Sequence, residues 1–470
     1  MVEVKADRPS ARLAFPARYA LIALGTTLLA FEGYNFAGLG VSVTGWGAAR
    51  MIGDTALGLA LLLAATLPAG SSARWRRIQS IYERLRVLAL LHTLALVVVS
   101  LLALSVAARL IFFTPPGRFV VTDVVAFTDE DARLVLRGAN PYDPQTSAQG
   151  FLEALRRFPN VTPTPLRTGH FATGEQLPTK AQQAARGQRA LAGPDPTAGG
   201  AFDPQTLHSY PALAFLLYVP LIWAGAPNIL LLNLMVYLAL LAWLTLLAPP
   251  SLRLWTCLAA LAALTLILFS LLADTEVISV GFLLLAWHYR TRNWWASAIL
   301  WGLGCAFKQY AWFFVPFFLL DAWLEQGNGW IAAAKRAGVA LIAFLTPNLP
   351  FIILSPAAWW NSLWLPVTAP LFPEGVGLVG LSTGGALPFF SPMLYTALEV
   401  VTLLAALWAF IRWRPKLRES ALLLALLPLL FAFRSLPNYF AVAPWLALYA
   451  ANVLYARSYQ RSSVSAPTSG

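Results

Sequence analysis

The sequence predicts an all-α polytopic membrane protein with about twelve transmembrane helices and a large outer loop that contains amphipathic helices. Of its 470 residues, 58% are hydrophobic and only 11% are charged, whereas a soluble globular chain is roughly half apolar and about a quarter charged. The apolar residues form long runs, of which residues 87–113 are the clearest. A run of about 18 or more apolar residues can cross a bilayer as a helix. Such runs recur along the whole chain, which excludes a single membrane anchor.

The basic residues lie in short segments beside the apolar runs, and the formal net charge is +12. They gather at residues 72–86, 334–338 and 412–420. Because Lys and Arg are enriched in cytoplasmic loops, these segments and both termini are expected in the cytoplasm. The charge therefore indicates a lipid bilayer as the partner and gives no reason to expect nucleic acid.

Twelve apolar spans can be placed along the chain. They are residues 19–36, 51–68, 87–113, 208–224, 229–247, 254–272, 277–287, 296–320, 339–354, 393–413, 422–433 and 440–455. The spans divide the chain into an N-terminal hairpin with a basic cytoplasmic loop (1–80), a transmembrane core (81–458) that carries an extracytoplasmic loop (114–207), and a disordered cytoplasmic tail (459–470).

One region conflicts with simple alternation of these spans. Residues 274–276 and 288–292 should lie on opposite sides of the membrane. Simple alternation of the spans places the basic residues of 288–292 on the non-cytoplasmic side. The run 296–320, around Lys308, is therefore either one span or two half-helices that enter the membrane and return. Broken helices are tolerated where their backbone lines a cavity or is covered by protein.

The outer loop, residues 114–207, is far longer than an ordinary connection between helices. Its first half reads TDVVAFTDEDARLVLRGANPYDP and predicts an amphipathic helix that ends at Gly138, a good C-terminal cap. Its second half is polar and rich in turn residues, and we expect it to be loosely ordered. A second outward loop, residues 355–392, carries the segments WWNSLW and GVGLVGLSTGG. Two loops on one face indicate a lidded, water-facing site above the helices.

Asp123 is the first candidate for chemistry, because it lies just beyond the outer end of the third span. A carboxylate at the membrane boundary can act as a general base toward a hydroxyl group. It could equally be a helix N-cap, a position for which Thr122 competes. Asp129, Glu130 and Asp131 are rivals that would more commonly form a solvated helix face.

Two cations are candidates for binding an anion. Lys308 interrupts the apolar run GLGCAFKQYAWFFVPFF, where an ammonium group is costly and indicates an anionic partner. That partner could be a lipid phosphate, or Lys308 could pair with Asp274 or Glu276, or extend to the membrane surface. Arg434 lies at an outer helix end, and its fork of donors suits phosphate, although an interfacial anchor is an equal alternative.

Polar residues near the outer ends of other spans could contact a substrate. Asp274 and Glu276 could bind sugar hydroxyls, pair with Lys308, or mark a short loop. His208 and Tyr210 open the fourth span, where a tyrosine is commonly an interfacial anchor.

The sequence contains no recognisable site for soluble nucleotide or metal chemistry. It has neither paired-His nor Cys-rich metal motifs, and neither a Walker A loop nor a GxSxG elbow. We therefore expect no metal and no cofactor, and a lipid-linked or membrane-embedded substrate.

Several segments together resemble the GT-C membrane glycosyltransferases, and most closely glycosyltransferase family 87, which uses polyprenyl-phosphate sugars. The resemblance lies in the outer-loop segment from Asp123 to Asp143 with its GANPYD ending, in LLADTEVISVGFLLL, in GLGCAFKQYAWFFVPFF and in FRSLPNYFA. It departs from the family in three places. The acidic loop follows the third span instead of the first, the aromatic after the acidic residue is Phe127, and the polar break reads Asp-Thr-Glu.

The resemblance implies an inverting, metal-independent transfer of a hexose or pentose from a polyprenyl-phosphate donor to a lipid or glycan acceptor. The site would face the extracytoplasmic side of the cytoplasmic (inner) membrane. Asp123 would take the proton of the acceptor, while Lys308 and Arg434 would bind the donor phosphate. Substrate contacts would come from Asp131, Asn140, Tyr142, His208, Tyr210, Asp274, Glu276, Asn438 and Tyr439.

Two other classes of function remain open from the sequence. A transporter or flippase for a lipid-linked or polar solute would use the same intramembrane charges as a substrate pathway. A membrane scaffold would use the outer loop to bind a partner, and replacing Lys308 would then affect stability alone.

Overall fold

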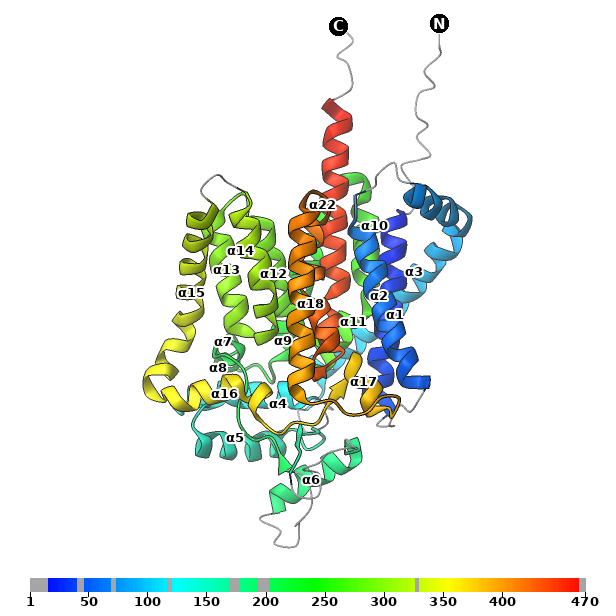
Figure 1. Ribbon diagram of the computed structural model, residues 1–470. Helices are drawn as coiled ribbons and strands as arrows, with labels where there is room; N and C mark the ends of the chain where they lie inside the picture. The colour runs from blue at the N-terminus through cyan, green and yellow to red at the C-terminus, as the bar shows by residue number, and fades with distance from the viewer. Residues whose placement is uncertain are drawn as a thin grey trace, which may run out of the picture.

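The structure is a computed structural model, and nearly all of its ordered backbone is helical (Figure 1). It describes residues 16–39, 46–68, 73–115, 118, 121–168, 178–192, 203–325 and 329–464. Within these ranges the only strands are two pairs of two-residue strands, β1 with β2 and β3 with β4. The prediction of an all-α fold is therefore confirmed.

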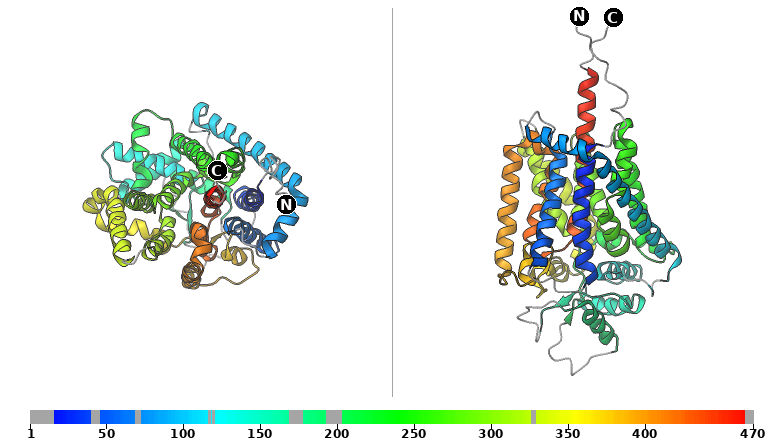
Figure 2. Two further views of the ribbon diagram at one scale, coloured as in Figure 1. Left: turned by 90° about the horizontal axis from the view of Figure 1, so that it is seen from above. Right: turned by 90° about the vertical axis from the view of Figure 1, so that its right-hand side faces the viewer.

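The long helices form one bundle, in which most axes run in a common direction (Figure 1). Its helices are α1 (Ala17–Leu39), α2 (Trp46–Thr66), α3 (Ala73–Phe113), α9 (Leu230–Leu247), α10 (Arg253–Leu261), α11 (Leu264–Ile267), α12 (Glu276–Tyr289), α13 (Trp294–Phe307), α14 (Val315–Trp323), α15 (Gly329–Leu354), α18 (Pro392–Arg412) and α22 (Ala443–Val464). Helix α3 crosses the outside of the bundle obliquely (Figure 2).

Short helical pieces connect these helices. They are α7 (Leu213–Leu216), α8 (Val219–Trp223), η4 (Pro250–Leu252), the π-helical η5 (Leu268–Ala273), η6 (Gln309–Phe314), α19 (Arg414–Leu417), η7 (Arg418–Ser420), α20 (Ala421–Leu424), η8 (Leu427–Phe431) and α21 (Asn438–Ala441). Many of them begin at a proline or end where a polar side chain enters the bundle.

Among the described residues, six helices are long and apolar enough to span a membrane, or seven if a pair bent by 52° counts as one span. Three further apolar helices are shorter, namely Leu213–Trp223, Glu276–Tyr289 and Trp294–Phe307. The prediction of a helical membrane protein agrees with this arrangement. The predicted number of about twelve spans is not matched by full-length helices, because proline residues and buried charges divide several apolar runs into shorter pieces.

The run around Lys308 consists of two helices that meet at a turn. Helix α13 ends at Phe307, Lys308 has an extended backbone, and α14 returns along the bundle after η6. The 14 residues of α13 span roughly 21 Å at about 1.5 Å per residue, which is short of a bilayer core of roughly 30 Å. The span predicted at residues 296–320 is thus wrong as a single helix, and the alternative of two half-helices describes it.

Small residues let these short helices pack closely. A Cβ on Gly302 of α13 would lie 2.2 Å from the carbonyl oxygen of Ala340 in α15. At the other side of the bundle, a Cβ on Gly25 of α1 would lie 2.9 Å from the carbonyl oxygen of Gly58 in α2. Glycine at both crossings allows the backbones to approach, as in helix pairs of membrane proteins generally.

The turn at Lys308 returns α14 to the end of the bundle where several arginines gather around Asp321, and we call this the basic end. There Asp321 accepts from Arg290 Nε at 3.1 Å, from Arg414 Nη2 at 2.7 Å and from Arg418 Nη2 at 3.0 Å. Glu419 accepts from Arg290 Nη2 at 2.9 Å. The conflict over residues 288–292 is resolved because α12 ends at the basic end, where Arg290 lies beside the other arginines.

The opposite end, the loop end, carries the segments outside the bundle (Figures 1 and 2). These are α4 (Asp123–Leu136), α5 (Pro144–Arg157), β1 (Pro165–Leu166), α6 (Lys180–Ala192), β2 (Asp203–Pro204), α16 (Pro356–Thr368), β3 (Glu374–Gly375), α17 (Leu378–Thr383) and β4 (Arg434–Ser435). The prediction that both outward loops share one face is confirmed. The amphipathic helix is α4, and Gly138 follows it with φ of 74°.

Two predictions of disorder differ from the structure. Helix α22 continues to Val464, so residues 459–464 are helical, while residues 465–470 lie outside the described part. In the second half of the outer loop, Lys180–Ala192 form α6, and residues 169–177 and 193–202 lie outside the described part. Helix α6 packs against α5. This tertiary contact stabilises a helix that the polar sequence of the segment did not predict.

We expect Asp321→Asn to destabilise the protein strongly. The carboxylate of Asp321 is buried among three arginines, and an amide leaves their positive charges uncompensated. Removing one partner of a buried charge cluster costs about 3–5 kcal/mol, which thermal unfolding in detergent would measure as a fall in Tm. The matched control is Glu153→Gln, since the Glu153–Arg156 pair lies exposed on α5. Equal Tm values for the two variants would contradict the assigned role of Asp321.

Candidate functional site

A cluster of buried charges lies where three broken helices meet, and we call its four residues Asp274, Glu276, Lys308 and Asn438 the charged centre. Lys308 Nζ lies 3.0 Å from Asp274 Oδ1 and 2.5 Å from Glu276 Oε1. Asn438 Nδ2 donates to Asp274 Oδ2 at 2.7 Å and to Glu276 Oε1 at 2.8 Å. Each of the four side chains is buried. Four residues from distant parts of the sequence thus form one connected network.

Local breaks in the helices place these side chains. The π-helical η5 ends before Asp274, whose Oδ1 accepts from the backbone N–H of Thr275 at 2.7 Å, and α12 begins at Glu276. Lys308 follows the last residue of α13, and Asn438 is the first residue of α21. Irregular backbone of this kind is tolerated within a membrane where protein covers it.

The charges of the centre do not balance, because two carboxylates face a single ammonium group. In a medium of low dielectric constant such a cluster is stabilised by its ion pairs and hydrogen bonds. Glu276 Oε2 is buried and has no hydrogen-bond partner among the described residues. Of the alternatives for Lys308, the structure contains the pairing with Asp274 and Glu276. The positive charge of Lys308 is therefore already neutralised within the chain.

Asp123 is the first residue of α4, and its carboxylate is held in place by neutral donors. Its Oδ2 accepts from the backbone N–H of Thr164 at 2.8 Å and from the Thr164 hydroxyl, and its Oδ1 accepts from the N–H of Val124 at 2.9 Å. The side chain is partly exposed, and it makes no ion pair with any described residue. Asp123 is thus a fixed carboxylate that forms no ion pair within the described part of the chain. The N-cap position, for which Asp123 and Thr122 competed, is held by Thr122, and the role of Asp123 as a base stays a prediction.

The three rival carboxylates of α4 are buried and already paired. Asp129 lies 2.9 Å from Arg133 and 3.3 Å from Arg157, while Glu130 pairs with Arg137. Burial raises the pKa of both carboxyl groups above the ordinary values, although the arginines oppose the change. Asp131 is buried as well and pairs with His208, so Asp123 is the most exposed of the four carboxylates of α4.

Tyr210 lies beside the charged centre. Lys308 Nζ lies 5.5 Å from the centroid of its ring, a cation–π distance. Burial raises the pKa of the Tyr210 hydroxyl, which lies within electrostatic range of both Lys308 and Asp123. Tyr439 lies within electrostatic range of both Lys308 and Arg434. Among the described residues, no hydrogen bond or ion pair joins Asp123 to the charged centre, so a site shared by these residues stays a prediction.

Arg434 also has an acidic partner. Its Nη2 lies 3.0 Å from Glu374 Oε2, and its Nη1 donates to the carbonyl oxygen of Phe372 at 3.3 Å. The parallel pair β3–β4 fixes this geometry by placing Glu374 opposite Arg434. No sequence pattern indicated Glu374, since 60 residues separate it from Arg434. One acidic partner and 15% side-chain exposure leave Arg434 more accessible than Lys308.

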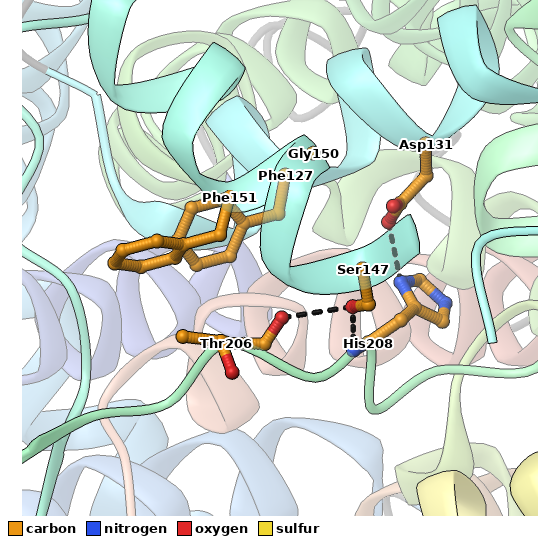
Figure 3. Close-up of a pocket in the computed structure, with 7 residues that line it drawn as sticks. All are labelled: Phe127, Asp131, Ser147, Gly150, Phe151, Thr206 and His208. Carbon is orange, nitrogen blue, oxygen red and sulfur yellow. Dashed lines mark hydrogen bonds and ion pairs between the residues drawn. The ribbon is translucent and has the colours of Figure 1, made fainter. Parts of the chain in front are cut away.

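The other predicted substrate contacts form a packed cluster that joins the outer loop to the bundle. His208 Nδ1 lies 2.5 Å from Asp131 Oδ2 (Figure 3). The Tyr142 hydroxyl donates to the carbonyl oxygen of Tyr210 at 2.8 Å, and its ring packs edge-on against His208. Asn140 Nδ2 donates to Ser355 Oγ at 3.1 Å. These contacts hold α4 and the segment that follows it against the bundle. A direct contact of these residues with a substrate stays a prediction.

A small hollow lies beside the Asp131–His208 pair (Figure 3). Its lining includes Phe127, Phe151 and Ser147, whose Oγ donates to the carbonyl oxygen of Thr206 at 2.8 Å. The cavity of about 10 Å³ has room for about one water molecule. It is too small for a sugar, so the substrate site is better sought between Asp123 and the charged centre.

The chain matches no family model, no curated protein and no solved structure. The resemblance to glycosyltransferases therefore depends on its motifs and on the positions of their residues. Among the residues that the structure describes, no group of three or more His, Cys, Asp or Glu side chains is arranged to hold a metal ion.

We expect Lys308→Met to destabilise the protein and Glu276→Gln to restore part of that loss. Without the ammonium group, two buried carboxylates would face each other, and neutralising one removes the repulsion. Coupling energies between contacting residues are about 0.5–3 kcal/mol, so the double variant should have a higher Tm than Lys308→Met alone. Thermal unfolding of the wild type, both single variants and the double variant completes the cycle. Simple additivity of the two changes would contradict the pairing in the charged centre.

Proposed function

We propose that this protein is a membrane glycosyltransferase that moves a hexose or pentose from a polyprenyl-phosphate donor to a lipid or glycan acceptor. The observation that carries the proposal is the state of Asp123, a fixed and partly exposed carboxylate that forms no ion pair with a described residue. It lies at the loop end, and Tyr210 lies within electrostatic range of both Asp123 and Lys308. A general base must reach the hydroxyl that it deprotonates. Asp123 is partly exposed, whereas Asp129, Glu130 and Asp131 are buried.

The reaction proposed for this site exchanges one bond for another. Asp123 accepts the proton of the acceptor hydroxyl while the oxygen of that hydroxyl forms a bond to the anomeric carbon. The bond between that carbon and the phosphate oxygen breaks, and the electron pair leaves with the polyprenyl phosphate. Attack opposite to the leaving group inverts the anomeric configuration. The developing charge on the phosphate is the larger demand, and fixed cationic donors meet such a demand best.

The two predicted phosphate-binding residues differ in their availability. A phosphate at Lys308 would compete with Asp274, Glu276 and their bonds to Asn438, so this role requires displacement of a buried carboxylate. Arg434 has one acidic partner, Glu374, and its guanidinium fork suits phosphate oxygens. We therefore assign the phosphate contact to Arg434 first. In the charged centre, Asp274 and Glu276 are proposed to accept hydrogen bonds from sugar hydroxyls.

The distribution of charge supports an orientation with the loop end outside the cytoplasm. Arg290, Arg414, Arg418 and Arg457 lie at the basic end, where acidic residues pair with them. Retention of positive residues on the cytoplasmic side would place Asp123 on the extracytoplasmic face of the inner membrane. A lipid-linked donor and an envelope acceptor would meet there.

We expect Asp123→Asn to reduce transfer by about 10²–10⁴-fold, the contribution typical of a general base. The amide can still accept from Thr164 or Val124, so the protein should fold with a Tm close to that of the wild type. Release of polyprenyl phosphate from a radiolabelled polyprenyl-phosphate sugar by protein in lipid nanodiscs measures the rate. Glu153→Gln, an exposed change on α5, is the control. A turnover by Asp123→Asn close to the wild-type rate would exclude Asp123 as the base.

The orientation has a separate test with single cysteines in a background of Cys257→Ala and Cys305→Ala. Glu153→Cys on α5 should react with a membrane-impermeant maleimide in intact cells, because α5 lies at the loop end. Lys416→Cys, exposed at the basic end, should react only after lysis. The reverse pattern would place the loop end in the cytoplasm and contradict the proposed location.

A transporter or flippase is the second candidate, and the charged centre is the observation that favours it. Buried ionisable residues at breaks in transmembrane helices commonly mark substrate or ion pathways. Flux of a lipid-linked sugar across proteoliposome membranes without any covalent change would favour this function. Product formation that stops with Asp123→Asn would favour the transferase.

A further inference from the structure

Arg167 differs from the other arginines near it because its guanidinium group pairs with no acidic side chain among the residues that the structure describes. Arg133, Arg137, Arg157 and Arg434 each pair with a carboxylate of α4 or of β3. The side chain of Arg167 makes neither a hydrogen bond nor an ion pair with any described residue, and its Nε is buried. A buried donor without an acceptor is costly, and a bound oxyanion would remove that cost.

Three segments fix the position of Arg167. It directly follows β1, which pairs with β2, and its backbone N–H donates to the carbonyl oxygen of Pro370 at 2.5 Å. Its guanidinium carbon lies 5.9 Å from the centroid of the Phe433 ring, within cation–π range. Phe433 precedes Arg434, so the two arginines project from adjoining positions where the first outer loop, the second outer loop and the start of α21 meet.

Arg167 is also linked to the proposed base. Thr164, three residues before Arg167, donates its N–H and its hydroxyl to Asp123 Oδ2. The short segment from Thr164 to Arg167 therefore holds the unpaired carboxylate at one end and carries the unpaired cation at the other. A movement of this segment would displace both groups together.

We propose that Arg167 binds a phosphate monoester and is the third phosphate-binding cation of this site, an inference that rests on the proposed function. Guanidinium groups donate two parallel hydrogen bonds to phosphate oxygens. Arg167 can do so without displacing a carboxylate, which Lys308 and Arg434 cannot. The phosphate could belong to a prenyl lipid or be free in solution, and the experiment separates these sources.

Binding by the full-length protein in nanodiscs tests this assignment. The probes are farnesyl phosphate, farnesol as its uncharged analogue, and inorganic phosphate, each titrated against the wild type, Arg167→Gln and Arg167→Lys. Loss of a charge-assisted hydrogen bond should weaken farnesyl phosphate about 10-fold or more in Arg167→Gln, with a smaller loss in Arg167→Lys. Farnesol binding should not change. Arg156→Gln on α5, which removes an arginine from an exposed pair, is the matched control.

The outcomes separate this inference from the proposed function. Wild-type affinity for farnesyl phosphate in a folded Arg167→Gln variant would overturn the role of Arg167 and leave the transferase proposal standing. Inorganic phosphate binding that depends on Arg167, without any binding of farnesyl phosphate, would support an oxyanion site and contradict a prenyl-phosphate donor. Because the Arg167 side chain has no hydrogen-bond partner in the described chain, Tm should stay within about 2 °C of the wild type. A larger fall would identify Arg167 as a structural residue and overturn the proposal.

Discussion

The cost of an uncompensated charge in an apolar layer governs this structure at both ends of its bundle. A charged group inside hydrocarbon costs several kcal/mol unless an opposite charge or several hydrogen bonds meet it. At the basic end, Asp321 and Glu419 receive the guanidinium groups of Arg290, Arg414 and Arg418. At the other end, Lys308 lies between Asp274 and Glu276. Helices stop or bend where these groups lie, so the pattern of charges determines where the apolar runs break.

This constraint also limits where chemistry can occur. A lysine that two buried carboxylates already neutralise stabilises the helices around it, and an incoming phosphate would have to replace those partners. The groups available to a substrate therefore belong to the loop end, where Asp123, Arg434 and Arg167 project from β-bridges and helix ends. The bundle supplies a rigid support for these residues, and loops on such a support commonly carry the functional groups.

The sequence predicted features that depend on local composition and failed for features that depend on contacts between distant residues. The apolar runs predicted α1, α2 and α3, and the pattern before Gly138 predicted α4. The return of the chain at Lys308 was only one of two alternatives, because the apolar composition is the same whether the helix continues or turns. The partners Thr164 and Glu374 could not be predicted, since they reach Asp123 and Arg434 through short β contacts across 41 and 60 residues.

The carboxylates and cations of the loop end divide into those that the chain pairs and those that it leaves unpaired. Asp129, Glu130 and Asp131 have basic partners within the fold. Within the described chain, Asp123 has neutral donors only, and the guanidinium group of Arg167 contacts an aromatic ring only. A carboxylate and a guanidinium group in this state can each still bind a ligand. A hydroxyl that gives up its proton satisfies the first, and a phosphate that leaves with negative charge satisfies the second. Transfer of a phosphate-linked group to a hydroxyl requires both at once.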